Sequence, residues 1–111
     1  MVDFRVHDSL IAHPKMLGIH PAALGLWTYA GAWSSHYLTD GLVPTEAIRH
    51  IPGWQRHAAE LVDRHLWAPV NGGGWTFIDW GQYQRTRTEV ETQRDLNRAR
   101  AQRARDRRRH A

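Results

Sequence analysis

The sequence contains no cysteine, and Lys15 is its one lysine beside fourteen arginines. Without cysteine the chain can form neither disulfides nor a thiolate metal site or thiol nucleophile. It has no apolar run near the roughly 20 residues that a membrane-spanning helix needs. Its first eight residues include Asp3 and Asp8 and lack the apolar core of a signal peptide. These absences indicate a cytoplasmic protein that does not enter a membrane.

Composition and charge predict a single small domain with a basic appendage. The chain has 111 residues, of which 41% are hydrophobic and six are tryptophan, so a core of modest size is expected. Residues 85–111 contain ten arginines against four acidic residues, a net charge of +6, whereas residues 1–84 have a net charge of −2. The basic character of the chain therefore belongs to its C-terminal tail.

The first half of the chain predicts one long helix among shorter elements. Pro21 suits the first position of a helix, where its missing N–H is not needed, and this helix is expected to run to about His36 with Leu24 and Trp27 on its inner face. The shorter elements that we expect are a strand at 4–6, a helical turn at 13–17, an extended pair at 42–43 and a short helix with Thr45 as its N-cap.

Residues 54–80 predict a helix followed by a glycine-tipped hairpin. The apolar stripe of an amphipathic helix is formed by Trp54, Ala58, Leu61, Val62 and His65. An extended run to Val70 leads into Asn71-Gly72-Gly73-Gly74, where glycine supplies the positive φ of a tight turn, and residues 75–78 return as a strand. With the short helix and the Pro52-Gly53 break before it, the pattern is typical of a winged helix-turn-helix.

The tail predicts a second long helix. Thr86 and Glu89 match a capping box, so we expect a helix from there to about Arg109, roughly 35 Å long. Val90, Leu96 and a few alanines are too few for a coiled coil, and residues 99–110 are expected to fray or stay disordered without a partner. The predicted organisation is a winged helix-turn-helix domain at 1–82, a connector at 83–85 and an arginine-rich helix or partly disordered tail at 86–111.

A series of short motifs follows the chain to about residue 95. They are Phe4-x-Val6-x-Asp8, His13-Pro14-Lys15, Pro21-x-x-Leu24-Gly25-Leu26-Trp27, Asp40-Gly41-x-Val43-Pro44, Leu61-Val62-x-x-x-Leu66-Trp67, Gly73-Gly74-Trp75, Asp79-Trp80-x-x-Tyr83-Gln84 and Thr86-Arg87-x-Glu89-Val90-Glu91. In this order and spacing the chain resembles the N-terminal domains of phage replisome organisers, which are winged helices related to DnaD-type primosomal proteins.

The resemblance implies an α+β, mainly helical fold: a winged helix-turn-helix with a C-terminal basic helix. It also implies DNA binding and an association with phage or prophage replication genes. Two residues depart from the family's pattern. His65 stands where the family usually has glycine, at a left-handed exit from the helix. Ile78 stands where the outer strand of the wing is usually polar, which predicts an exposed apolar spot facing a partner or the tail helix.

The helix that begins at Trp54 is the first candidate DNA-binding element. In a helix-turn-helix the N-terminal residues of the second helix read base edges, and Gln pairs with adenine as Arg pairs with guanine. Because two acidic residues balance its arginines, this helix attracts phosphate weakly, and a purely structural role remains the alternative. The residues assigned to this surface are Gln55, Arg56 and Arg64.

The arginine-rich tail is the second candidate. A helix with arginine on all sides binds polyanions by charge rather than by sequence. The alternative is a solvated helix held by Glu91–Arg94 and Asp95–Arg98 pairs, each worth about 0.2–0.5 kcal/mol. The nucleic-acid-binding residues assigned to the tail are Arg85, Arg87, Arg94, Arg98, Arg100, Arg103 and Arg105.

Neither a metal centre nor an active site is predicted. Eight histidines are present, but no two stand four residues apart on one predicted helix, and the tight Cys/His clusters that zinc prefers do not occur. The sequence has no nucleophile elbow, P-loop or metalloprotease motif. We expect no cofactor, no metal and no enzymatic activity.

The six tryptophans are interpreted mainly as core residues. Stacking on single-stranded bases is the alternative. We place Trp27, Trp54, Trp67 and Trp75 inward, and Trp33 and Trp80 in the core or at an interface.

These patterns together favour a non-enzymatic nucleic-acid-binding protein, an accessory or initiator factor of phage or prophage DNA replication. Duplex DNA is favoured over single-stranded DNA as its partner. One alternative is a protein-interaction module that binds a replication protein or self-associates as a homodimer. Another is a small transcription regulator that uses the same DNA contacts.

Overall fold

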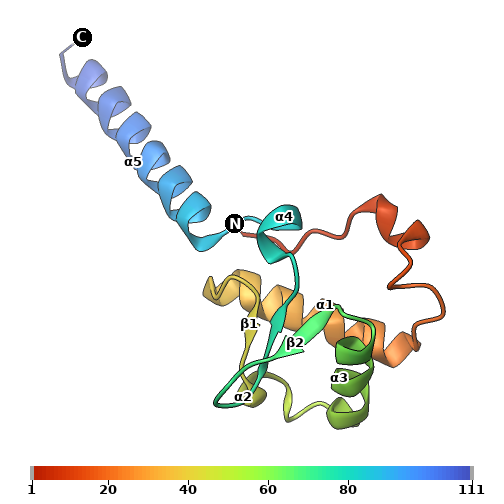
Figure 1. The fold of residues 1–111 in the computed structure, drawn as a ribbon. Helices are drawn as coiled ribbons and strands as arrows, with labels where there is room; N and C mark the ends of the chain where they lie inside the picture. Colours follow the sequence, from red (N-terminus) through yellow and green to blue (C-terminus); the bar gives the residue numbers. More distant parts are fainter. Residues whose placement is uncertain (1, 111) are drawn as a thin grey trace.

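A computed structural model describes residues 2–110 and has an α+β fold, 58% helical, with a three-stranded antiparallel sheet and a C-terminal helix (Figure 1). The predicted α+β, mainly helical class is confirmed. The elements in order are the 3-10 helix η1 Asp8–Ala12, α1 Pro21–Tyr37, β1 Leu42–Val43, α2 Thr45–Ile48, α3 Trp54–Asp63, β2 Trp67–Pro69, β3 Trp75–Phe77, α4 Trp80–Tyr83 and α5 Arg87–Arg109.

Helix α1 begins as predicted at Pro21, where the His20 ring accepts a hydrogen bond from the Ala22 N–H at 3.0 Å and caps the helix. Its inner face differs from the prediction, since Leu24 and Trp27 are only half-buried. The buried residues of α1 are Ala23, Leu26, Ala30, Gly31, Ser34 and Ser35. The small residues on this face let neighbouring segments approach closely, and a Cβ atom at Gly31 would overlap the Phe4 ring.

Strand β3 lies in the middle of the sheet, between β1 and β2. Val43 pairs with Trp75, and Trp67 pairs with Phe77. The extended pair predicted at 42–43 is therefore confirmed, and it forms a strand that pairs with the hairpin. Val43, Trp67 and Phe77 are buried and belong to the core that the sheet shares with the helices.

The hairpin tip is held against the start of α2. Gly74 has φ 87°, and a Cβ atom there would lie 2.6 Å from the Val43 carbonyl oxygen and 2.9 Å from Pro44 Cα. No side chain fits this position without moving the β1–α2 junction. The glycine turn predicted at Asn71–Gly74 thus has a packing role as well as a conformational one.

The core lies between the sheet, α1 and α3. Its largest fully buried side chains include Trp67, Ile48 and Leu61. Trp80 is also buried, which places it in the core. The other tryptophans are half-buried against this cluster: Trp27, Trp33, Trp54 and Trp75.

The N-terminal arm, residues 2–19, differs most from the prediction. Residues 4–6 form no strand, because the Gln84 side chain takes the place of a strand partner. The Arg5 N–H donates to Gln84 Oε1 at 2.8 Å, and Gln84 Nε2 donates to the Arg5 carbonyl at 2.7 Å. Phe4 then packs its ring on Trp27. The helical turn expected at 13–17 is a run of turns at 14–18, and η1 precedes it.

Two local predictions near helix ends are corrected. Thr45 is the first residue of α2 rather than its N-cap, a position that Pro44 occupies in an extended conformation. Tyr83, placed in the connector at 83–85, ends the short helix α4, whose Gln84 N–H donates to the Trp80 carbonyl at 2.8 Å. The predicted left-handed exit at His65 is confirmed, with φ 59°.

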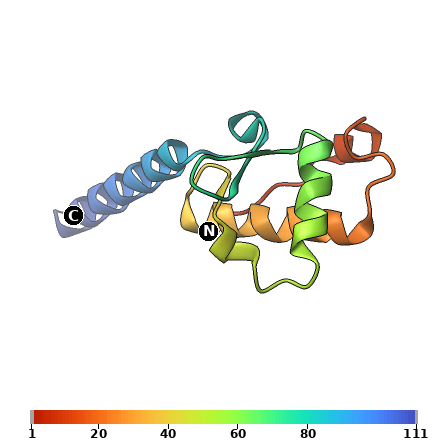
Figure 2. The same ribbon diagram turned by 60° about the horizontal axis from the view of Figure 1, so that its bottom comes forward.

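Helix α5 begins as predicted, with Thr86 Oγ1 accepting from the Glu89 N–H at 3.2 Å. The helix continues to Arg109, through the segment where fraying was expected. It projects away from the rest of the chain (Figure 2), so the longest dimension is 62 Å and the radius of gyration is 18.0 Å. A compact chain of about 100 residues would have a radius of gyration of about 13 Å.

Candidate nucleic-acid interface

The residues predicted to bind nucleic acid fall on two separate surfaces. Gln55, Arg56 and Arg64 belong to α3 and its end, whereas the tail arginines lie on α5 and just before it. The two surfaces lie at different parts of the elongated molecule (Figure 1). They are therefore described one at a time.

The start of α3 presents polar side chains to solvent and packs against the hairpin. Gln55 and Arg56 are exposed, as predicted, and Gly53 precedes the helix with φ 76°. Trp54 packs edge-on against Trp75 of the hairpin, with 5.9 Å between ring centroids. This contact fixes the first turn of α3 beside the hairpin, where its two outward polar side chains can approach a ligand together.

Arg64 is engaged within the chain. Its Nε donates to Glu60 Oε2 at 2.8 Å, and Nη1 donates to the carbonyls of Leu17 at 2.8 Å and Lys15 at 3.2 Å. The side chain is 23% exposed. These bonds tie the N-terminal arm to the end of α3, so the geometry gives this guanidinium a structural role.

Glu60 accepts a second hydrogen bond, beside the one from Arg64. Its Oε2 also accepts from the His20 backbone N–H at 3.1 Å. That bond is the largest cause that lowers the pKa of the Glu60 carboxyl below its ordinary value, and the Arg64 guanidinium adds to it against the effect of burial. A charged Glu60 thereby joins the start of α1 to α3.

The α5 arginines differ in how they are paired. Arg87 Nε donates to Glu91 at 2.9 Å, Arg98 pairs with Asp95, and Arg105 donates to the Gln102 amide at 2.7 Å. The Arg87–Glu91 bond raises the pKa of the Arg87 guanidinium. Among residues 2–110, no side-chain partner within bonding distance is found for Arg94, Arg100 and Arg103.

The root of α5 is fixed, whereas the rest of the helix is free. Val90 is 2% exposed, and the Arg87 backbone N–H donates to the Asp40 carboxylate at 2.6 Å. Arg85, directly before the helix, is half-buried, and every residue from 91 to 103 is exposed. The helix therefore presents its arginines to solvent from a defined attachment point.

Arg49 is an exposed basic residue that the sequence interpretation assigned to neither surface. It is exposed at the end of α2, in the turn that leads to α3. The neighbouring His50 is also exposed, and its ring bonds to the Tyr29 hydroxyl at 3.2 Å. The signal that could have identified Arg49 is its place between two predicted helices, next to the exposed start of the second one.

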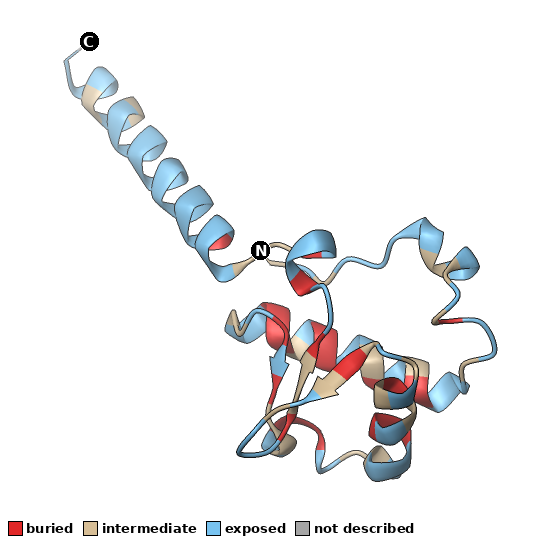
Figure 3. Cartoon of the chain, in the orientation of Figure 1, coloured by how far each residue is buried: buried red, intermediate tan, exposed pale blue. Residues whose placement is uncertain are grey.

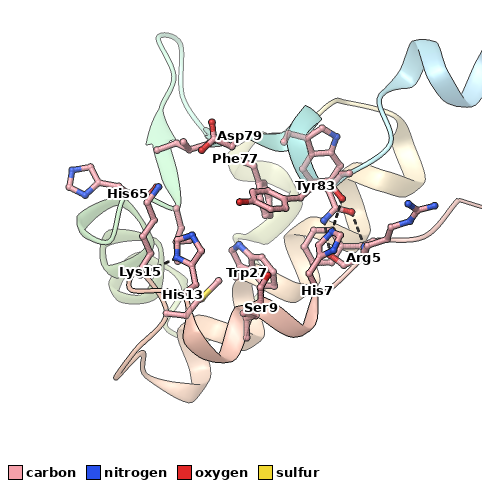
Figure 4. A pocket seen from close by; sticks show the side chains of 17 residues that line it. Arg5, His7, Ser9, His13, Lys15, Trp27, His65, Phe77, Asp79 and Tyr83 are labelled. Atoms are coloured by element: carbon pink, nitrogen blue, oxygen red, sulfur yellow. Dashed lines mark hydrogen bonds between the residues drawn. The ribbon is translucent and has the colours of Figure 1, made fainter.

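A cavity of about 90 Å³ lies under the N-terminal arm (Figure 4). Its lining includes the aromatic rings of Phe4, Trp27 and Phe77 and the polar side chains of His13 and Lys15. The polar groups are engaged nearby: Lys15 Nζ donates to the His65 carbonyl at 2.9 Å, and the Lys15 N–H donates to the His13 ring. Within the part of the chain that is described, no three His, Cys, Asp or Glu residues form a metal-binding group.

The comparisons with protein-family models, with curated proteins and with solved structures find no match for this chain. Within residues 2–110, no helix is both long enough and apolar enough to cross a bilayer.

Proposed function

We propose that this protein is a non-enzymatic, duplex-DNA-binding factor of phage or prophage replication. The observation on which the proposal rests is α5, a projecting helix with nine arginines against four acidic residues. Beyond Val90 the helix has no buried residue among those described. A charged surface of this kind, exposed to solvent within residues 91–103, is suited to a polyanionic ligand.

The order of the elements supports a winged helix-turn-helix interpretation of the body. A helix, a strand, two helices and a two-stranded hairpin follow one another, and β1 pairs with the second hairpin strand. On this interpretation α3 is the recognition helix, with Gln55 and Arg56 at its exposed start. Kinship with the DnaD-type replisome organisers, and with it the role in replication, is part of the same proposal.

The two surfaces would contribute differently to binding. Residues 1–84 have a net charge of −2, so the body gains little from phosphate neutralisation. The α5 arginines would supply most of the affinity for any sequence, whereas α3 and the hairpin would orient the duplex. If about six charges contact phosphate, affinity should fall about 10³-fold between 50 and 200 mM salt.

Fluorescence anisotropy with a labelled duplex tests this proposal. The full chain should bind at low salt with a steep salt dependence, and deletion of residues 94–111 should weaken binding to all sequences. Absence of a complex at 50 mM salt would contradict the proposal. The genes that flank the coding sequence would then separate a role in replication from one in transcription.

A second candidate function, a protein-interaction module, is favoured by exposed apolar side chains. Ile78 is 36% exposed, as the sequence predicted, and Val6, Ile11 and Leu17 on the N-terminal arm are 54%, 81% and 62% exposed. Such side chains suit a replication-protein partner or a second copy of the chain. Light scattering that reports a dimer, together with no gel shift at low salt, would favour this candidate.

A further inference from the structure

We propose that α5 lies in the major groove of B-form DNA and contacts the phosphates of both groove walls with opposite faces. The inference rests on the proposed DNA binding and deepens it, because it names the groove, the duplex form and the residues on each wall. One face consists of Arg94, Arg98, Arg105 and Arg109, and the other of Arg100, Arg103 and Arg107.

The sequence spacing places these two sets on opposite sides of α5. With about 100° of rotation per residue, the members of each set lie within about 60° of one another. The centres of the two sets are about 180° apart. A helix that lay along one phosphate strand would use a single face. Two opposed faces suit a ligand that has phosphates on both sides of the helix.

The existing contacts of these arginines do not prevent phosphate binding. The Arg98–Asp95 pair is exposed, with side chains 73% and 66% accessible. Exposed pairs of this kind contribute about 0–1 kcal/mol, so a phosphate can replace the carboxylate. Within residues 2–110, Arg100 and Arg103 form no ion pair, which leaves the second face ready for contact.

The dimensions of α5 match the groove. An α-helix with side chains is about 10–12 Å across, and the major groove of B-form DNA is about 12 Å wide. From Arg94 to Arg109 the helix extends roughly 22 Å. The deep, narrow major groove of A-form RNA does not admit side chains. The ligand is therefore duplex DNA rather than duplex RNA.

The attachment of α5 to the body leaves this part of the helix accessible. Val90 is buried and residues 91–103 are all exposed, so α5 is accessible to solvent beyond its first turn (Figure 3). Asp40 holds the backbone of Arg87 at the root of the helix. The groove can thus enclose the arginine-bearing segment without displacing any buried residue of the chain.

Two matched triple variants of the full chain test the use of both faces. R94Q/R98Q/R105Q removes three charges from one face, and R100Q/R103Q/R107Q removes three from the other. Glutamine keeps the helix propensity close to that of arginine, and circular dichroism checks that α5 stays helical. R94K/R98K/R105K is the control that keeps the charge.

Binding to a duplex of about 30 base pairs is measured between 50 and 200 mM salt. Each glutamine triple should reduce the slope of log K against log salt by about 2.7, because each phosphate contact contributes about 0.9. The change in affinity over this range should therefore shrink about 40-fold for either triple. The lysine control should keep the slope of the unchanged chain.

Modified duplexes test the groove itself. The test uses the Arg56→Gln variant, so that base reading by α3 contributes little. In DNA whose cytosines bear glucosylated hydroxymethyl groups, these groups fill the major groove, and this DNA should bind the variant at least tenfold more weakly than unmodified DNA. Prior binding of netropsin in the minor groove should leave the affinity of α5 unchanged. Duplex RNA of the same length should bind more weakly than DNA at every salt concentration.

The outcomes separate this inference from the function on which it rests. If only one triple changes the slope, α5 lies on one phosphate strand and the groove proposal is wrong. Equal binding to the major-groove-blocked duplex, or complexes whose mass contains two duplexes per protein, would also overturn it. If both triples combined leave DNA binding intact, the proposed role of α5 in DNA binding fails as a whole.

Discussion

At the scale of single residues, Arg56 at the start of α3 and Arg64 at its end have different surroundings. Arg56 is exposed, whereas Arg64 donates to Glu60 and to two carbonyls of the arm. We expect Arg64→Gln to lower the free energy of unfolding by about 2 kcal/mol, as for hydrogen bonds to charged groups. Arg56→Gln should change it by less than about 0.5 kcal/mol.

For DNA binding, the substitution with the larger expected effect is Arg56→Gln rather than Arg64→Gln. Arg56→Gln should weaken binding to sequences selected from a random pool by about 1–3 kcal/mol, and binding to unselected DNA much less. Urea unfolding and anisotropy measure the two effects. Equal losses on selected and unselected DNA would mean that Arg56 contacts phosphate and reads no base.

Gly74 and Gly72 form a matched pair in the hairpin tip. Both have φ near 90°, but a Cβ atom at Gly72 would meet open space, whereas one at Gly74 would collide with the Val43 carbonyl. Gly72→Ala should cost about 1–2 kcal/mol through backbone strain alone. Gly74→Ala should cost about 1–3 kcal/mol more through the overlap. Thermal unfolding of the two variants that gave equal losses would contradict the observed packing of the tip.

Glu60 predicts a pH dependence of stability. Its folded pKa lies below the ordinary value of 4.5, chiefly because the His20 N–H donates to it. The stabilisation is therefore present above about pH 4.5 and is lost as the pH falls through the folded pKa. Glu60→Gln should reduce stability at pH 7 and flatten its decline in acid. The exposed Glu46→Gln serves as the control and should keep the decline of the unchanged chain.

At the scale of elements, α5 depends on its first turn. Thr86 caps the helix, whereas the exposed Thr88 bonds to no backbone N–H within residues 2–110. Thr86→Ala should destabilise α5 by about 1 kcal/mol, and Thr88→Ala should not. Circular dichroism at 222 nm and amide exchange in residues 87–95 measure this difference. Equal helicity in both variants would show that the cap does not limit the helix.

Elements with strong local signals could be predicted from the sequence. Pro21 marked the start of α1, the glycines of the hairpin marked its turn, and Thr86 marked the start of α5. Elements that depend on partners distant in sequence could not be predicted in this way. The Arg5 backbone pairs with the side chain of Gln84, which is 79 residues away in sequence, so no local pattern reveals the contact.

At the scale of the whole molecule, the candidate site was only partly predictable. The outward position of Gln55 and Arg56 followed from helical spacing, and the structure places both on the surface. The hydrogen bonds of Arg64 to the arm could not be predicted from helical spacing, because their carbonyl acceptors lie 47 and 49 residues away in sequence. The concentration of positive charge in residues 85–111 was visible in the sequence. That α5 projects away from the rest of the chain could be seen only in the structure.

The double hydrogen bond between Gln84 and the Arg5 backbone has a mechanical consequence. Gln84 stands three residues before α5, so a force on α5 reaches the N-terminal arm through Gln84, and it reaches the body through the bond between Asp40 and the Arg87 backbone. The arm is in turn joined to the end of α3 through Arg64. If α5 binds DNA as proposed, a force on the bound duplex is therefore shared between the arm and the segment that contains Asp40.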